Sequence, residues 1–141
     1  MSSIAELCLQ EVLARLQAAP PIAAGKVRRG HRTGPTRDMG TVVDVVDGQD
    51  TPMDDSDCSR KREKEFAVVL NGRKDWGVSF LDDLMVDVNA RLDPSVTAYP
   101  GNAILKQGAL IFDEEIADLD MCRVEMRFKL SYRTTGWPLD A

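Results

Sequence analysis

The chain has 141 residues, a size that fits one domain with its own core, so we expect a single domain over residues 1–141. Its 18 basic and 23 acidic residues give a net charge of −5, which disfavours free nucleic acid as the main partner because phosphate binding needs a basic surface. The chain does not open with a basic region followed by an apolar run, and no apolar run approaches the roughly 20 residues of a membrane helix, so we expect a soluble protein made in a cytoplasm, with no membrane partner.

The first third of the chain predicts one helix, two short strands and a polar loop. Apolar residues recur at helical spacing over Ser3–Ala18, with Ser3 as the N-cap and Glu6 as its capping-box partner. A short strand centred on Val27 is expected next. The Gly-rich, charged residues 30–40 show no period and predict a mobile loop, and the β-branched run Thr41–Val46 predicts a strand.

The middle of the chain predicts a second mobile polar loop, at about residues 47–62, because acidic residues are followed there by basic ones without an apolar face. Lys64–Leu70 then reads as a strand whose two faces are both covered. Asn71-Gly72 is a strong turn signal, so we expect the strand to end there. Apolar residues return at helical spacing over Val78–Leu92, which predicts a second helix ended by Asp93-Pro94.

The last third predicts two strands joined by acidic residues. Ala103–Phe112 is apolar without clean alternation and reads as a strand in which Gly108 marks a bulge or turn. After the acidic stretch Asp113–Asp120, Cys122–Tyr132 alternates apolar and mostly charged residues without a slip, so one face of this long strand should be buried. The order of elements indicates an α+β fold: a mostly antiparallel sheet of about four strands with two main helices packed on one face.

No group of residues forms a convincing catalytic or metal site. His31 is the single histidine and lies in the first polar loop, and the adjacent helix residues Asp82 and Asp83 diverge by about 100°. Asp54, Asp55 and Asp57 suggest calcium at first sight, but the glycine and closing glutamate of a calcium loop are missing. We therefore expect no cofactor, no metal and no enzymatic activity, and a protein whose work is done by its surfaces.

The cysteines and tryptophans have structural interpretations. Cys8 and Cys122 fall on apolar faces and should be buried reduced thiols, whereas Cys58 should be exposed in a loop. Trp76 precedes the second helix and is expected to pack at the core or its rim. Trp137 lies beyond the last strand, where it either packs locally or contacts a partner.

The layout resembles the tail terminator proteins of long-tailed bacteriophages, also called tail completion or minor tail proteins. The resemblance rests on the helix beginning Leu81-Asp82-Asp83-Leu84-Met85 and on the end of the last strand, Leu130–Thr135, with its Tyr-Arg-Thr sequence. It implies a ring, usually of six copies, that caps the tail tube, stops its growth and offers a joining surface to the head–tail connector. It implies that the protein lies in the host cytoplasm before assembly and in the virion tail or neck afterwards. DNA would only pass through the ring as cargo.

A ring needs two different complementary patches on each copy, because its contacts are heterologous. Candidates are a basic face, formed by Arg123, Arg127, Lys129 and Arg133, and the acidic residues Asp54, Asp55, Asp57 and 113–120. These basic residues could instead simply solvate one face of the sheet. Another phage neck or head-completion component, or a small adaptor protein, is the alternative function.

Overall fold

The computed structural model describes residues 3–20, 22, 26–30, 41–55, 60–73, 78–116 and 121–134. Its elements are the helices α1 (Ile4–Gln17) and α2 (Val78–Leu92), the short 3-10 helix η4 (Pro100–Asn102), and the strands β1 (Val27–Arg29), β2 (Val42–Asp55), β3 (Arg60–Arg73), β4 (Ile104–Ile116) and β5 (Met121–Thr134). The strands form one sheet in the order β1-β2-β3-β5-β4, antiparallel except for the β1–β2 pair. The expected α+β class is confirmed, with five strands in place of about four.

The strand β5 lies inside the sheet, as its alternating sequence predicted. It pairs with β3 from Met121↔Arg73 to Thr134↔Arg60 and with β4 on its other side. Every second side chain is buried against the helices: Cys122, Val124, Met126, Phe128, Leu130 and Tyr132. The opposite parity forms what we call the open face, the side of the sheet away from the helices.

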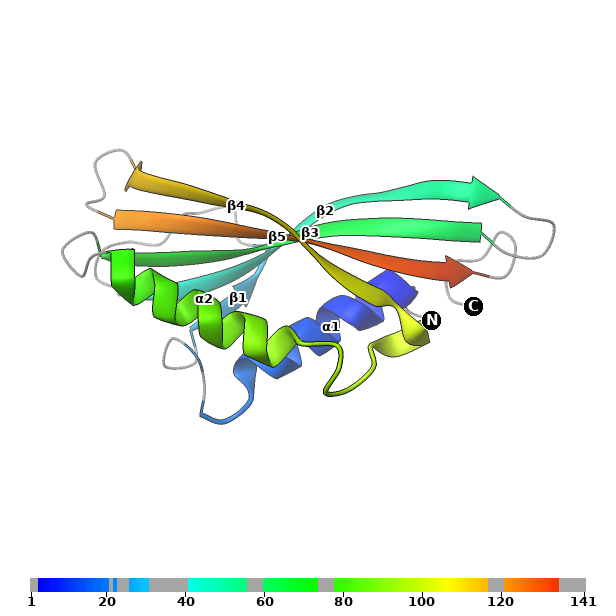
Figure 1. The fold of residues 1–141 in the computed structure, drawn as a ribbon, viewed down its shortest axis with the longest axis horizontal. Coiled ribbons are helices and arrows are strands. Elements are labelled where there is room, and N and C mark those ends of the chain that lie inside the picture. The colour runs from blue at the N-terminus through cyan, green and yellow to red at the C-terminus, as the bar shows by residue number, and fades with distance from the viewer. Residues whose placement is uncertain are drawn as a thin grey trace.

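Both helices cover the same face of the sheet, beneath the strands in Figure 1. The hydroxyl of Ser3 caps α1 by accepting a hydrogen bond from the Glu6 backbone N–H at 3.1 Å. Most side chains of the predicted helical stripes are buried, namely Leu9, Val12 and Leu16 in α1 and Leu81, Met85, Val88 and Leu92 in α2. Leu13 and Leu84 of the predicted stripes are partly buried, and α1 also buries Ile4, Ala5 and Cys8. Cys8 and Cys122 are buried and free, as expected.

Two arginines join the helices end to end. Arg91 of α2 donates hydrogen bonds to backbone carbonyls at the end of α1, including that of Ala18 at 2.8 Å. Arg15 of α1 donates to the carbonyl of Thr97 at 2.6 Å, beyond the end of α2, and lies 4.1 Å over the Tyr99 ring. Each guanidinium therefore satisfies carbonyls that the end of a helix, or the turn after it, leaves without a partner.

The prediction of a mobile polar loop at about residues 47–62 is wrong, because β2 runs to Asp55 and β3 begins at Arg60. Ion pairs between β2 and β3 replace an apolar face there, for example Arg62 Nε to Asp50 Oδ1 at 2.9 Å. The sequence signal failed because this part of the hairpin buries little on either face, so its strands can be polar. Most of the first expected loop, residues 31–40, lies outside the described residues, as do His31, Cys58 and Trp76.

Two further boundaries differ from expectation. Asn71-Gly72 does not form a turn but continues β3, where Asn71 is buried and its amide donates to Asp44 Oδ2 at 3.3 Å. A Cβ at Gly72 would lie 3.3 Å from a methyl carbon of Leu81, so the glycine serves close approach of α2. The acidic residues 113–115 belong to β4, which runs to Ile116, and do not form a connecting loop.

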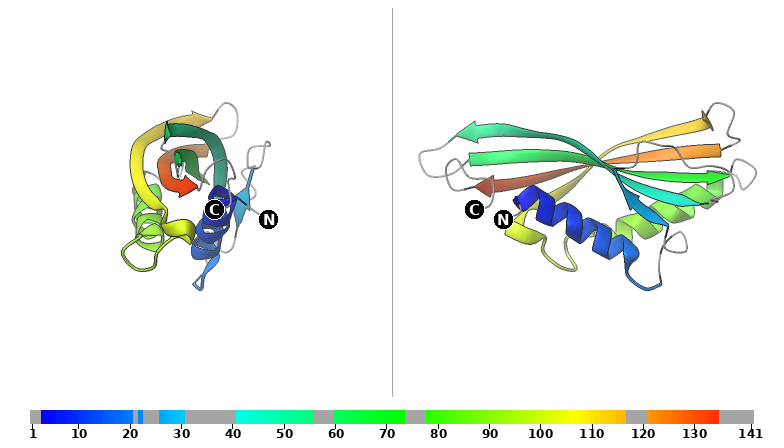
Figure 2. Two further views of the ribbon diagram at one scale, coloured as in Figure 1. Left: turned by 90° about the vertical axis from the view of Figure 1, so that its right-hand side faces the viewer. Right: turned by 180° about the vertical axis from the view of Figure 1, so that it is seen from behind.

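Two β-bulges lie at one level of the sheet and coincide with its strongest visible twist. The register shifts between Asp47 and Asp50 in β2 and between Gln107 and Leu110 in β4, which confirms the bulge expected at Gly108. A Cβ at Gly48 would approach the Glu65 carbonyl oxygen to 2.8 Å, so the first bulge needs a glycine. Bulges increase local twist, and the strands cross one another at a waist in Figure 1 and curl in the end-on view of Figure 2.

Candidate assembly surface

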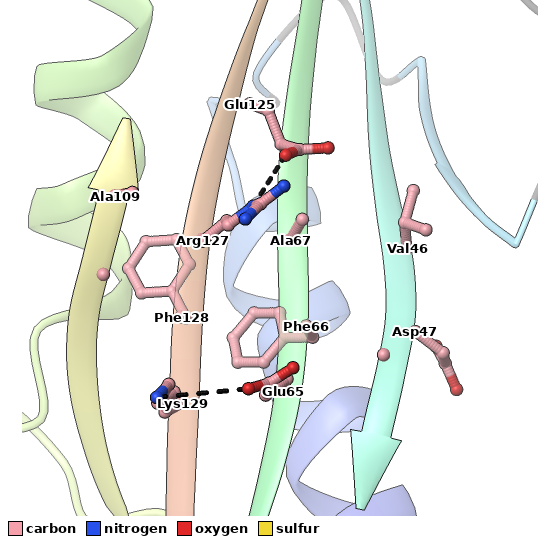
Figure 3. Close-up of a pocket in the computed structure, with 12 residues that line it drawn as sticks. Val46, Asp47, Glu65, Phe66, Ala67, Ala109, Glu125, Arg127, Phe128 and Lys129 are labelled. Carbon is pink, nitrogen blue, oxygen red and sulfur yellow. Dashed lines mark hydrogen bonds and ion pairs between the residues drawn. The ribbon is translucent and has the colours of Figure 1, made fainter. Parts of the chain in front are cut away.

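The four basic residues predicted from the sequence do share one surface. Arg123, Arg127, Lys129 and Arg133 are exposed on the open face of β5. The surface is not uniformly basic, because Arg127 Nε lies 2.8 Å from Glu125 Oε2 and Lys129 Nζ lies 4.0 Å from Glu65 Oε1 (Figure 3). Lys129 Nζ also lies 3.4 Å from Glu63 Oε1. Part of the charge that was expected to attract a partner is thus balanced within the chain.

The acidic candidates divide between described and undescribed parts of the chain. Asp54 and Asp55 lie in β2, in register with Lys61 and Arg60 of β3. Asp113 is in register with Arg123. Asp57 and Trp137 lie outside the described residues, as does 117–120. The registers place several acidic and basic candidates beside each other in one chain, which the sequence did not indicate.

The open face holds a shallow hollow of about 510 Å³ at the level of the two bulges. Small residues line its floor, namely Ala67, Gly108 and Ala109. Its rim carries the ion pairs of Arg127 and Lys129 (Figure 3). Below it, the rings of Phe66 and Phe128 stack with centroids 5.3 Å apart. The hollow mixes charges of both signs on an open surface, so it suits contact with a protein surface more than enclosure of a small molecule.

One end of the open face is closed by a polar cluster. Asp44 and Asn71 are buried, and Arg28 binds Asp44 through two hydrogen bonds of 2.8 and 3.1 Å. Val69 beside them is buried as well, so the cover expected on both faces of Lys64–Leu70 is present at Val69, whereas Ala67 is only partly buried and Glu65 is exposed. The bidentate geometry and the Asn71 amide satisfy the carboxylate, and we assign this cluster a structural role.

A second ionic cluster ties α1 to the sheet. Arg29 of β1 donates to both carboxylate oxygens of Glu6 at 2.6 Å and to Asp47 Oδ2 at 3.0 Å. Hydrogen bonding from Arg29 lowers the pKa of Glu6 below its ordinary value of 4.5. The Glu6 side chain thus binds β1 in place of its predicted capping-box role, while its backbone N–H is still capped by Ser3.

Tyr132, from the Tyr-Arg-Thr sequence, is part of the core and of a polar contact beside it. Its ring is buried and its hydroxyl donates a hydrogen bond to the Asp50 carboxylate, which also pairs with Arg62. Burial, and then the bond to Asp50, raises the pKa of this hydroxyl above its usual value. Tyr132 therefore closes the core at the far end of the β2–β3 hairpin.

The sequence reasoning missed the surface of β4. Four of its large apolar side chains are exposed: Ile104 by 59%, Leu110 by 51%, Ile111 by 40% and Phe112 by 52%. Apolar residues on both parities of Ala103–Phe112 were the available signal, because an edge strand without a covering helix exposes both. We call the outer side of β4, with these four residues, the β4 edge.

The described part of the chain offers little for chemistry. It holds no group of three or more His, Cys, Asp or Glu that could bind a metal ion. Asp82 and Asp83 are exposed on α2. Burial raises the pKa of the Cys8 thiol to about 11, which lowers its reactivity as a thiolate. None of the helices in the described ranges is long and apolar enough to cross a membrane.

Comparison by sequence gives no family model and no curated protein that matches this chain. By structure, the chain is similar to a chain of a solved "Virion of native gene transfer agent (GTA) particle", with a TM-score of 0.71 and 16% sequence identity. The similarity covers 95% of this chain and 100% of the other. The two chains share one fold.

Proposed function

We propose that this chain is a structural virion protein that caps the tail tube, stops its polymerisation and provides the joining surface for the head connector. The observation that carries the proposal is the near-complete structural similarity to a chain of the gene transfer agent virion. The Leu81–Leu92 helix, which resembles that of tail terminators, lies in α2, and residues 130–134 of the second resembling sequence lie at the end of β5. Fold similarity and motif resemblance favour the same class of protein.

A ring of six copies is the form in which the protein would act. Rings need two unlike surfaces on each subunit, and the apolar β4 edge and the charged open face are the two candidates for this role. The tail tube protein and the head–tail connector are the proposed partners above and below the ring. The protein would lie in the host cytoplasm before assembly and in the tail or neck of the virion afterwards, and this role needs neither cofactor nor catalytic group.

DNA is proposed to pass through the ring as cargo. Arg127 and Lys129 pair with glutamates of their own chain, so they are poor candidates for strong phosphate binding. Exposed Arg133 makes no such pair among the described residues and lies in register with Lys61. If Arg133 lines the lumen, its contacts with DNA would be weak and independent of sequence.

Electron microscopy of particles made without this gene tests the proposal. We expect tails of abnormal length without attached heads, and normal joined particles when the gene is supplied in trans. Tails of normal length that lack heads would favour a neck or head-completion component in place of a terminator. Normal tails attached to heads would exclude both roles.

A further inference from the structure

Most charges in the described part of the chain are balanced by a partner within it, and a few are left over. Among the basic side chains that the structure describes, three make no ion pair and no other interaction within the chain: Lys61, Lys106 and Arg133. Among the described acidic side chains, Asp82 and Asp83 are the two without a partner. A contact through these five side chains would break no ion pair of the chain itself.

The three unpaired cations gather at one end of the open face. Lys61 of β3 stands opposite Arg133 of β5 in the register, and Lys106 of β4 stands opposite Lys129. Like charges directly opposite each other on one face of a sheet repel. Ile104 lies on the same side of β4 as Lys106 and is 59% exposed. We call Lys61, Lys106, Arg133 and Ile104 the cationic end.

Negative charge near the cationic end does not cancel it. Glu63 and Glu65 lie on the same face, but both contact Lys129, at 3.4 and 4.0 Å. Asp54 of β2 is in register with Lys61, which nevertheless makes no ion pair among the described residues. The other two cations stand opposite basic residues, so this end of the open face keeps a positive charge.

The two unpaired acids lie on the outer side of α2. Asp82 and Asp83 are exposed, and Val86, one turn further along the helix, is 64% exposed. At about 100° per residue, Val86 projects between the two acids, about 40° from Asp82 and about 60° from Asp83. We call these three residues the outer face of α2. Like the cationic end, it is an exposed aliphatic side chain flanked by unpaired charges of one sign.

We propose that the outer face of α2 on one copy docks against the cationic end of the next copy, so that the copies join head to tail. The inference rests on the ring of the proposed function and names its contact. Asp82 and Asp83 would supply the opposite charge, and Val86 would pack against Ile104 inside a charged rim. Arg133 would then face the neighbouring copy and not the lumen.

The positions of the two surfaces favour a contact that repeats between copies. α2 lies on the helix side of the sheet and begins at one end of the molecule, whereas the cationic end lies on the open face, where β5 ends at the opposite end (Figure 1). One chain cannot bring its own two surfaces together. Each copy can use both at once with a different neighbour at each, as a closed ring requires.

Two other arrangements compete with the ring contact. A two-fold dimer of antiparallel copies would use the same two surfaces but stop at two chains. Another virion component with an acidic surface would use the cationic end and leave the outer face of α2 free. The following experiments separate both from the head-to-tail contact.

Charge reversal of each surface tests the contact. The acid-to-base variant carries Asp82→Lys and Asp83→Lys, the base-to-acid variant carries Lys106→Glu and Arg133→Glu, and each is supplied in trans to particles that lack the gene. We expect each variant alone to lower the number of joined particles by about tenfold or more, because like charges then meet. A chain with all four changes should recover most of this loss, because opposite charges meet again.

Added positive charge away from both surfaces is the control. Ala14→Lys with Gln17→Lys changes exposed positions of α1 and should leave particle numbers unchanged. All variants should keep the wild-type melting temperature, because every changed side chain is exposed. An equal loss with the control would overturn the contact. A loss confined to the base-to-acid variant and not recovered by all four changes would also overturn it, and would assign the cationic end to another virion component.

Cross-linking between introduced cysteines provides a second measurement. Val86→Cys and Ile104→Cys are made in separate chains with Cys58→Ser, leaving the buried Cys8 and Cys122. The variants are incorporated into particles alone or mixed, and treated with a short bis-maleimide. We expect covalent dimers only from the mixture, and a ladder ending at about six chains from a chain carrying both introduced cysteines.

The outcome of this experiment separates failure of the contact from failure of the proposed function. Cross-links within one variant alone, a ladder that stops at two chains, or no cross-link in particles that contain the protein would overturn the head-to-tail contact while leaving the proposed function standing. Absence of the protein from wild-type particles would instead reject the proposed function. One gel and an immunoblot of purified particles distinguish these failures.

Discussion

The helix side of β5 and the β4 edge are built from similar apolar residues and have opposite fates. Val124 and Leu130 of β5 are fully buried beneath the helices, whereas Leu110 and Phe112, on the same face of the neighbouring strand, are half exposed. In register, Leu110 lies opposite Met126 and Phe112 opposite Val124. The difference teaches that the helices close the core over β5 but leave Leu110 and Phe112 of β4 half exposed, so that β4 carries an apolar surface.

The largest expected effect is the loss of a core side chain from β5. Leu130→Ala should lower the free energy of unfolding by about 2–5 kcal/mol, because it removes buried methyl groups and leaves a cavity. Urea unfolding measures the change. The neighbouring exposed Lys129→Ala is the control and should stay within about 0.5 kcal/mol. Similar losses from both variants would contradict the two-sided character of the strand.

A smaller loss should follow from breaking the buried ion pair on the open face. Arg28→Met leaves the Asp44 carboxylate buried with only the Asn71 amide in place of its bidentate partner. We expect a loss of about 3 kcal/mol, the lower end for a broken buried pair, since 18% of the Arg28 side chain is exposed. The double variant Arg28→Met, Asp44→Val should recover part of the stability in thermal melts. An Arg28→Met melt equal to wild type would show that the cluster does not stabilise the sheet.

The tie between α1 and β1 predicts a modest dependence on pH. Because Arg29 lowers the pKa of Glu6 in the folded state, the pair's contribution is present above the unfolded pKa of about 4.5 and is lost as pH falls through the folded pKa. Glu6→Gln should therefore reduce stability at pH 7 and converge with wild type as the pH falls well below 4.5. Unfolding curves between pH 3 and pH 7 measure this, with Asp83→Asn on the exposed face of α2 as the charge-loss control. A constant difference across the range would show that the ion pair is not its source.

The smallest effect on folding is expected at the β4 edge. Phe112→Lys should change the free energy of unfolding by no more than about 0.5 kcal/mol, because the ring is already half exposed. The same substitution at Phe128, a buried phenylalanine of β5, should prevent stable folding. If Phe112→Lys unfolds the protein, the β4 edge belongs to the core and the contrast with β5 is wrong.

Much of the fold could be predicted because periodicity records one-sided burial. The helix Val78–Leu92 and the alternation of β5 each have one apolar face, and their bounds or faces were correct. The polar outer halves of β2 and β3 have no apolar face and were predicted as a loop, since their strand structure rests on cross-strand ion pairs such as Asp50–Arg62. The turn predicted at Asn71-Gly72 was wrong for a related reason. The hydrogen bond from Asn71 to the Asp44 carboxylate and the close packing of Gly72 against Leu81 override the local turn preference.

The candidate surface was predicted only in part. Arg123, Arg127, Lys129 and Arg133 share the open face because alternate residues of a strand point the same way. The pair of Arg127 with Glu125 lies within β5, between residues of one parity, whereas the pairing of Lys129 with Glu63 and Glu65 could not be foreseen because it depends on which strand lies beside β5. The β4 edge was not foreseen either, since an apolar strand reads the same whether it is central or at an edge.

The sequence by itself determined the class of fold, the two helices and the buried face of β5, because these follow from spacing along a single segment. Only the tertiary structure decided the strand order, and with it which charges are balanced within the chain and which apolar strand is left at the edge. Strand order is a relation between segments far apart in the chain, and no local pattern encodes it.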